Sequence, residues 1–223
     1  MIQLVFKRRE AKYLLDDRQY ARVRQAMEGI MQPDEWGAST VLNIYYDTPQ
    51  FQLVRRSIER PFYKEKMRIR SYGVPSEDDH IFVELKKKND GIVYKRRSEM
   101  TQAEADALLR GVGQPQTQIE RELDFSVRRY GGLIPAVFIG YDREAFYDAH
   151  DRDFRITFDK RIRSRWDKLS LSAGDEGDLL LDDNMTLMEI KTAEAIPLWL
   201  TSILSEERIF KASFSKETLI NDV

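Results

Sequence analysis

The segment Lys66-Met67-Arg68-Ile69-Arg70 alternates charged and apolar side chains, and this alternation constrains the fold more than any other feature of the chain. A period of two is typical of a β-strand, in which successive side chains point to opposite faces. Lys66, Arg68 and Arg70 therefore share one predicted face. Neighbouring cations repel each other unless negative charge lies opposite, so this face borders either bulk water or an anion.

The same alternation recurs along the chain. Polar side chains stand two residues apart, in most cases with apolar residues on the other face, in Arg8/Glu10/Lys12, Glu84/Lys86/Lys88, Lys95/Arg97, Tyr141/Arg143, Arg155/Thr157/Asp159 and Glu189/Lys191. One basic strand alone would indicate a solvated surface. Repetition strand after strand predicts a sheet whose apolar faces pack outward under helices, while its ionic faces converge on an interior lumen.

The composition fits one globular domain over residues 1–223. Hydrophobic residues make up 42% of the 223 residues, and charged residues make up 33%. The net charge is only -2, with 36 Lys and Arg against 38 Asp and Glu, which predicts no general affinity for nucleic acid. Any affinity for anions must therefore come from local clustering of cations.

The chain contains no cysteine, which excludes disulfides, a thiolate nucleophile and a cysteine-based zinc site. This fits a reducing compartment, and we expect a cytoplasmic protein. The first residues become charged too early for a secretory signal peptide. Apolar runs fall short of the roughly 20 residues that a bilayer span needs, so no transmembrane segment is expected.

Periodicity and turn signals predict an α+β fold with mostly antiparallel strands. The expected strands cover residues 4–14, 41–47, 64–72, 80–88, 92–99, 134–147, 154–162 and 186–191. Asn89-Asp90-Gly91 is a strong hairpin signal between two of these strands. Residues 31–39 contain Pro33 and Gly37 and are predicted to form a loop, as are residues 170–178.

Helices are predicted from their caps. Asp16 or Asp17 can begin a helix that runs to about residue 29, and a short helix is expected near 50–56. Thr101 and Thr117 each begin a capping box, with glutamate three residues later. Two further helices are expected, one from Pro197 to Leu204 and one starting near Ser215.

The cations of the alternating segments form the candidate binding set. It consists of Arg8, Lys12, Arg68, Arg70, Lys86, Lys95, Arg97, Arg143, Arg155, Lys191 and Lys216. Arginine offers paired planar donors to phosphate oxygens and lysine offers a point charge, so the set suits a condensed phosphate chain. Burying so many cations without an anion would cost several kcal/mol each, so a lumen without substrate should hold water, sulfate or phosphate.

Glu189 is the candidate metal ligand, although its neighbour Lys191 equally allows a simple ion pair within the sheet. Mg²⁺ and Mn²⁺ are often held by one or two carboxylates together with substrate phosphates. Glu10 and Glu84 are weaker candidates for the metal, and we expect them to pair with neighbouring arginine and lysine side chains. The glycines show no nucleotide-binding spacing, so any ATP would be held without a conventional phosphate loop.

Taken together, these residues resemble the VTC domain, the catalytic polyphosphate polymerase module of the triphosphate tunnel metalloenzyme superfamily, in its bacterial form. The segments that carry the resemblance span nearly the whole chain: 9–13, 68–72, 83–86, 93–97, 140–143, 155–159, 188–191 and 214–216. The resemblance implies a closed, mostly antiparallel eight-stranded β-barrel with peripheral helices.

The resemblance also implies roles for single residues. The phosphate chain would be bound by Lys12, Arg68, Arg70, Lys86, Lys95, Arg143 and Arg155, with Tyr141 beside them. Glu189 would hold Mn²⁺ or Mg²⁺, and Ser215 and Lys216 would close one mouth of the tunnel. Arg8 stands where the wider superfamily has the first carboxylate of its Glu-x-Glu-x-Lys pattern, which favours the polymerase branch over a two-metal triphosphatase.

The expected function is transfer of the ATP γ-phosphoryl group to a growing polyphosphate chain. The alternatives are a tripolyphosphatase or nucleoside triphosphatase in the same tunnel, a polyphosphate- or inositol-phosphate-binding module without catalysis, and a β-rich domain whose charges only solvate it. The eukaryotic proteins of this kind carry further sensing and membrane domains, neither of which we expect in this chain, and the resemblance leaves a membrane-protein partner open. The sequence leaves the oligomeric state open.

Overall fold

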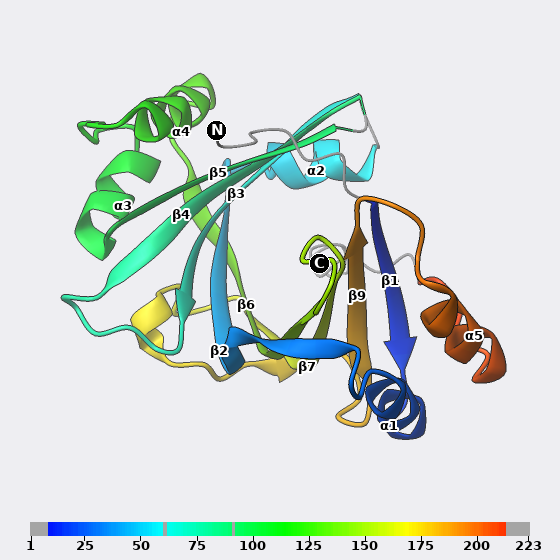
Figure 1. Ribbon diagram of the computed structural model, residues 1–223. Coiled ribbons are helices and arrows are strands. Elements are labelled where there is room, and N and C mark those ends of the chain that lie inside the picture. The colour runs from blue at the N-terminus through cyan, green and yellow to red at the C-terminus, as the bar shows by residue number, and fades with distance from the viewer. Residues whose placement is uncertain (1–8, 60–61, 91, 213–223) are drawn as a thin grey trace.

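The computed structural model describes residues 9–59, 62–90 and 92–212, and its framework is one curved antiparallel sheet (Figure 1). The strands are β1 (Arg9–Leu15), β2 (Met31–Asp47), β3 (Tyr63–Tyr72), β4 (His80–Asn89), β5 (Ile92–Thr101), β6 (Ile134–Asp148), β7 (Arg155–Arg165), β8 (Asp178–Leu179) and β9 (Thr186–Thr192). The eight longer strands lie in the order β1-β9-β7-β6-β2-β3-β4-β5, and β8 pairs with β7.

In the described part of the chain, five α-helices and one short 3₁₀ helix accompany the sheet. They are α1 (Asp17–Ala26), α2 (Gln52–Ile58), α3 (Gln102–Leu109), α4 (Gln118–Arg129), α5 (Leu198–Glu206) and η1 (Leu171–Ala173). Both predicted capping boxes are confirmed, because the Thr101 and Thr117 side chains accept from the backbone N–H groups of Glu104 and Glu120. Asp16 caps α1, which ends before the expected residue 29.

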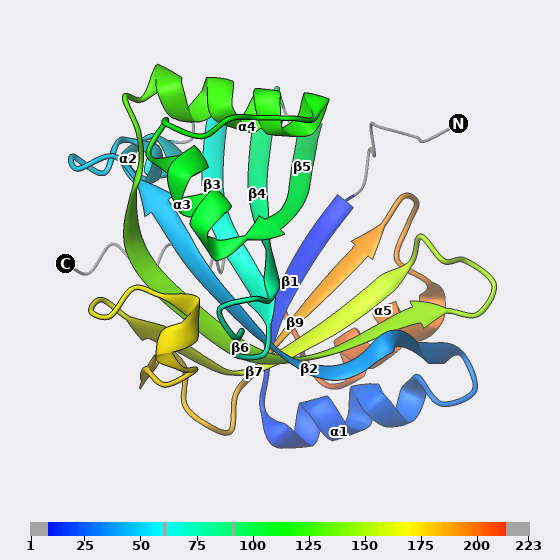
Figure 2. The ribbon, with the colours of Figure 1, turned by 90° about the vertical axis from the view of Figure 1, so that its left-hand side faces the viewer.

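The sheet does not close into a barrel, so the predicted closed eight-stranded barrel is wrong. The described strands β1 and β5 stand at the two ends of the strand order and share no hydrogen-bonded ladder. The sheet nevertheless curls until these ends approach each other across an opening (Figures 1 and 2). An ion pair of 3.8 Å between Lys86 Nζ on β4 and Glu10 Oε2 on β1 links the two sides.

Residues 211 and 212 occupy part of the outer edge of β1, which gives a physical reason why β1 and β5 do not pair. Tyr13 forms an antiparallel bridge with Lys211, and the Ala212 N–H donates to the Lys12 carbonyl at 2.8 Å. A strand edge offers its outward N–H and C=O groups to one partner at a time. Residues after α5 therefore occupy part of the edge that β5 would need for closure.

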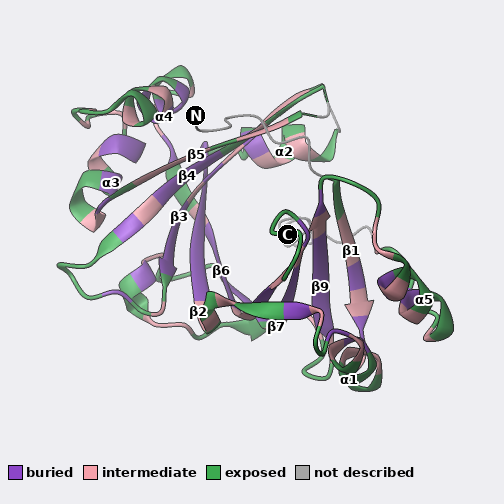
Figure 3. Cartoon of the chain, viewed as in Figure 1, coloured by how far each residue is buried: buried purple, intermediate pink, exposed green. Residues whose placement is uncertain are grey.

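The outer faces of the strands are apolar and lie beneath helices, as predicted. Met67 and Leu85 belong to a buried cluster with Leu108 of α3 and Leu123 of α4. A second cluster joins β1, β7 and β9 to α1 and α5. Figure 3 shows burial concentrated along the strands and on the helix sides that face them.

The inner face is less uniformly ionic than the alternation predicted. A third buried cluster is built from β2, β6, β7 and β9, and it contains Val41, Tyr45, Val137, Ile139, Tyr141, Ile162 and Leu187. The register of β2 with β3 places Tyr45 beside Arg68, which shows that part of this cluster shares the face of the cations. Strands β2 and β6 are therefore apolar on both faces, and they form a hydrophobic base between the charged walls.

Residues 31–39 are part of β2, so the predicted loop is wrong. Pro33 pairs with Phe146 and Ala38 with Glu144, and the register shifts between these two pairs. Such an irregularity tolerates the residues that suggested a loop, since Pro lacks an N–H and Gly37 adopts a φ of 55°. The segment therefore bulges out of the ladder without ending the strand.

Other expectations concern shorter segments. The segment 170–178 carries η1 and the first residue of β8, whereas the helix expected near Ser215 lies outside the described residues. None of the described helices has the length and apolar character that crossing a membrane requires.

The outer face of β4 provides a stability test. Leu85→Ala should lower the free energy of unfolding by about 2–5 kcal/mol, because the side chain is 1% exposed and its loss leaves a cavity under α3 and α4. Leu198→Ala, at an 84% exposed position, is the matched control and should stay within about 0.5 kcal/mol. Urea denaturation measures both, and equal effects would contradict the assignment of this face to the core.

Candidate functional site

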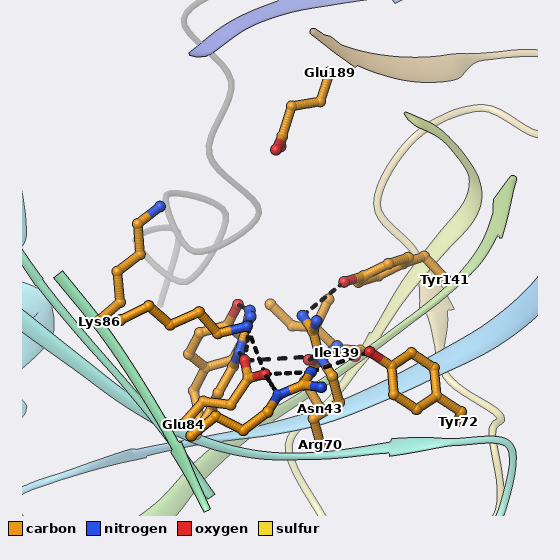
Figure 4. A network of polar contacts seen from close by, with 12 residues as sticks. Asn43, Arg70, Tyr72, Glu84, Lys86, Ile139, Tyr141 and Glu189 are labelled. Carbon is orange, nitrogen blue, oxygen red and sulfur yellow. Dashed lines mark hydrogen bonds and ion pairs between the residues drawn. The ribbon is translucent and has the colours of Figure 1, made fainter. Parts of the chain in front are cut away.

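A buried carboxylate, Glu84 on β4, lies at the centre of cations from β3 and β5 (Figure 4). Arg68 Nη2 approaches Glu84 Oε2 at 2.6 Å, and Arg70 Nε lies 4.0 Å from the same oxygen. Arg97 Nε and Lys95 Nζ approach Oε1 at 2.6 and 2.8 Å. Glu84 is 2% exposed. Four cations thus surround one carboxylate, and we call this group the Glu84 cluster.

Side chains from β2 and β6 fix two of these arginines from below. Arg68 Nη1 donates to Tyr45 Oη at 2.9 Å. Arg70 Nε donates to Asn43 Oδ1 at 2.9 Å, and Arg70 Nη2 donates to Tyr141 Oη at 3.1 Å. Neutral oxygens position the guanidinium groups without cancelling their charge, so the Glu84 cluster keeps its excess of positive charge.

The pKa values of Glu84 and Lys95 reflect the charges that surround them. Burial by itself would raise the pKa of Glu84, but the surrounding cations, Arg68 first, outweigh burial and hold this pKa well below its usual range. Burial lowers the pKa of Lys95 to about 8, although Glu84 opposes this effect. The positive charges of Arg68 and Arg97 act in the same direction as burial and lower the pKa of Lys95 further.

A second carboxylate, Glu189, lies on the opposite wall, and its side chain projects toward the same space (Figure 4). Glu189 Oε1 lies 2.8 Å from Lys191 Nζ, and Oε2 lies 3.8 Å from Lys12 Nζ. Burial would raise the pKa of Glu189, but Lys191 and Lys12 outweigh it and keep this pKa far below the ordinary value. The predicted Lys191 pair therefore exists, and Glu189 is ionised.

Arg143, on β6, lies close to Glu189. Its Nε and Nη2 atoms donate to the two oxygens of Asp159 at 2.6 and 2.8 Å, and Asp159 is fully buried. The Arg143 guanidinium also lies 4.9 Å from the centre of the Tyr141 ring. Tyr141 thus contacts both Arg143 and Arg70, and it connects the two charged walls.

The residues around Glu189 fit a single divalent cation better than a pair. Within the described ranges, no three carboxylate or imidazole groups gather into a metal site. Thr157 is the register partner of Glu189, and its buried Oγ1 atom has no hydrogen-bond partner there. An unpaired buried hydroxyl beside a carboxylate can serve a ligand, so these two side chains suit a cation that takes its remaining ligands from phosphate and water.

The remaining predicted residues lie at the margins or outside the described residues. Lys86 extends away from the Glu84 cluster to Glu10, and Glu10 also lies 3.4 Å from Lys12. Arg155 Nη2 donates to Asp34 at 3.2 Å. Arg8, Ser215 and Lys216 are not among the described residues, so their predicted roles stay predictions.

The sequence did not single out the side chains that hold the cations in place. Asn43 and Tyr45 lie in a nearly continuous apolar strand, where period two gives no signal. The alternation predicts Asp159 to be one more charge on an ionic face, whereas it is a fully buried partner of Arg143. Only the register between strands reveals these contacts.

The arrangement is suited to binding a chain of anionic groups. Cations on both walls can exchange their carboxylate partners for phosphate oxygens, which accept the same charge-assisted hydrogen bonds. The carboxylates are poorly suited to removing protons, because Glu84 and Glu189 have low pKa values and Asp159 is held by Arg143. The geometry therefore favours chemistry that needs charge neutralisation more than a general base.

Comparison with known proteins points to one family. A sequence model of the family described as "VTC domain" matches residues 7–217. No curated protein matches the chain.

Solved structures share the fold. A candidate adenylate cyclase from Bacillus halodurans is 16% identical, with 96% of each chain covered and a TM-score of 0.60. A candidate adenylyl cyclase from Hippeastrum, described as having a dominant triphosphatase activity, is 14% identical, with 96% of this chain and 94% of that chain covered and a TM-score of 0.58. A Pyrococcus horikoshii protein is 18% identical, with 96% of each chain covered and a TM-score of 0.50. Identities this low establish the fold alone.

Removal of the central carboxylate tests the electrostatics of the site. Glu84→Gln should lower the free energy of unfolding at pH 7 by about 3–5 kcal/mol, because it leaves four cations without their shared counter-charge. Added tripolyphosphate should raise the melting temperature of this variant more than that of the wild type. Glu99→Gln, at an exposed position of β5, should change neither quantity appreciably.

The acid dependence of stability has a defined sign in this experiment. The folded pKa of Glu84 is depressed, so its contribution is present above the unfolded value of about 4.3 and is lost as the pH falls below it. Urea titrations between about pH 5 and pH 2 should show a steeper loss for the wild type than for Glu84→Gln. Equal slopes would contradict the low pKa.

Proposed function

The chain belongs to the VTC domain family, and from that premise we propose that it transfers the γ-phosphoryl group of ATP to a growing polyphosphate chain. One observation carries the proposal: four cations, two from β3 and two from β5, converge on the single carboxylate of Glu84 on the strand between them. This excess of positive charge is costly unless anions share the site. A run of phosphate groups supplies closely spaced negative charge of the kind that the cluster lacks.

The proposed division of labour follows the two walls. Arg68, Arg70, Lys95 and Arg97 bind the triphosphate of the donor, and each charge-assisted hydrogen bond contributes about 1.5–3 kcal/mol. Arg143, Lys12 and Lys191 on the other wall hold oxygens of the acceptor chain. Tyr141 and Asn43 keep Arg70 in position while it exchanges Glu84 for phosphate. The roles of Arg8, Lys86, Arg155, Ser215 and Lys216 at the ends of the path follow the family resemblance.

Glu189 and Thr157 would hold a divalent cation, Mn²⁺ or Mg²⁺, among the phosphate oxygens. Such a cation supplies charge neutralisation at the transferring phosphoryl group. The carboxylate is aligned for this role by Lys191 and Lys12, which would move toward phosphate when the cation binds.

Transfer is favoured over hydrolysis by the state of the acidic groups. The terminal oxygen of a polyphosphate acceptor is already an anion, so no base is needed to activate it. Water as the acceptor needs orientation and benefits from a base, and the buried carboxylates of the inner face are tied to cations. The triphosphatase activity ascribed to the Hippeastrum protein makes hydrolysis of a triphosphate the second candidate.

Product analysis tests the proposal directly. Incubation with ATP and Mn²⁺ or Mg²⁺ should yield ADP and a polymer that resists nuclease and is digested by exopolyphosphatase. Glu189→Gln should lower kcat by about 10²–10³-fold, because charge neutralisation at the transferring group is lost, while ATP affinity changes little. Release of inorganic phosphate as the main product would reject transfer in favour of hydrolysis.

A matched control separates this effect from general damage. Glu28→Gln makes the same chemical change at an exposed position after α1, and it should leave kcat unchanged. Binding of ATP without any turnover, equally strong in Glu189→Gln and the wild type, would instead identify a polyphosphate-binding module.

The low pKa of Lys95 gives a pH signature. Lys95 must be protonated to bind phosphate, so the affinity for tripolyphosphate should fall as the pH rises through about 8. Lys95→Arg remains charged, and it should bind roughly tenfold more tightly than the wild type at pH 9.5 but with similar affinity at pH 7. Calorimetry measures the ratio of the two affinities at each pH. Protonation of tripolyphosphate affects both proteins equally, so it cancels in this ratio. Lys211→Arg is the control, and a ratio that stays constant with pH would contradict the assignment.

A further inference from the structure

Three aromatic side chains form a shelf beside the Glu84 cluster. The Trp36 and Tyr72 rings are stacked, with centroids 5.8 Å apart and an angle of 9° between their planes. The Phe82 ring meets Tyr72 edge-on, with centroids 5.9 Å apart. We call these three side chains the aromatic shelf.

The aromatic shelf is joined to the proposed phosphate site by Arg97. Arg97 Nη2 donates to Tyr72 Oη at 3.0 Å, and the guanidinium carbon lies 4.1 Å from the centre of the Phe82 ring. The same guanidinium donates to Glu84 through Nε at 2.6 Å. A phosphate that replaces Glu84 as the partner of Arg97 would therefore lie next to aromatic rings.

The bulge of β2 holds Trp36 at this place. Asp34 Oδ1 accepts from the Trp36 backbone N–H at 3.1 Å, and Asp34 Oδ2 accepts from Arg155 at 3.2 Å. Through Asp34, the bulge is therefore bound to Arg155, a predicted phosphate-binding residue. Through Trp36, it contacts Tyr72, the hydrogen-bond partner of Arg97. The register shift between Pro33 and Ala38 interrupts the regular pairing of β2 with β6 at the segment that carries Asp34 and Trp36.

The exposure of Trp36 is the feature that packing leaves unexplained. Its side chain is 64% exposed and Tyr72 is 42% exposed, whereas Trp199 packs against the buried Phe154. One face of the indole covers Tyr72. A large flat apolar surface that stays open beside a cluster of cations offers both contacts that a nucleotide needs, a stacking surface and a phosphate site.

We propose that the aromatic shelf is a nucleobase-stacking subsite, which holds the base of a nucleoside triphosphate while the Glu84 cluster holds its phosphates. This inference rests on the proposed function. It adds an explanation of how the site distinguishes the nucleotide donor from polyphosphate without a base. Stacking on an aromatic face tolerates any base. ATP and GTP should therefore bind alike, and the smaller rings of CTP and UTP should bind several-fold more weakly.

The test compares a nucleotide with its phosphate chain alone. Affinities are measured by calorimetry for the β,γ-imido analogue of ATP and for tripolyphosphate, with the wild type, Trp36→Ala, Trp36→Phe and the control Trp166→Ala. Trp36→Ala should weaken nucleotide binding by about 5- to 100-fold and leave tripolyphosphate binding within about twofold. Trp36→Phe should retain most of the nucleotide affinity, and Trp166→Ala should match the wild type. The nucleotide should also quench tryptophan fluorescence in the wild type and lose this effect in Trp36→Ala.

The outcomes separate the shelf from the proposed function. An equal loss of both affinities in Trp36→Ala, or no loss of either, overturns the shelf and leaves phosphoryl transfer standing. A nucleotide affinity that depends on Trp36, combined with no ADP formation, supports the shelf and rejects the transferase. Failure of the wild type to bind the nucleotide overturns both.

Discussion

The mutual repulsion of cations on one sheet face is the constraint on which this structure depends. Arg68, Arg70, Lys95 and Arg97 come from β3 and β5, and the carboxylate of Glu84 on β4 lies among them. The cost of burying Glu84 is offset by these contacts, which also lower its pKa. One carboxylate allows the chain to fold without substrate, yet leaves enough positive charge to attract a polyanion. In the proposed function, folding and substrate binding therefore use the same contacts.

Neutral polar groups make this compromise workable. Asn43, Tyr45 and Tyr141 lie on the base of the sheet and accept hydrogen bonds from Arg68 and Arg70, which orients these arginines without neutralising them. Asn43 also donates to the Ile139 carbonyl. Hydrophobic residues on both faces of β2 and β6 give this base its rigidity. In the proposed phosphoryl transfer, the cations of the charged walls would exchange partners while these supports remain in place.

The opening between β1 and β5 shows how edge contacts decide architecture. Residues 211 and 212 occupy part of the β1 edge. The two sides of the opening are linked by the ion pair between Glu10 and Lys86 in place of backbone hydrogen bonds. The alternating pattern gives no information about which edges meet, because it describes faces. This limit explains why the predicted closure was wrong while the predicted outward packing under helices was confirmed.

The sequence by itself determined most of the strand segments, the apolar outer faces of those strands, where α3 and α4 begin and to which family the chain belongs. Period-two alternation and capping boxes are local, so they can be read without knowing the neighbours. Only the tertiary structure decided that Pro33 and Gly37 lie in a bulge, that Asp159 is the buried partner of Arg143, and that Trp36 stacks on Tyr72. These features depend on register and curvature, which bring together side chains distant along the chain, and no local pattern encodes the distance between two strands.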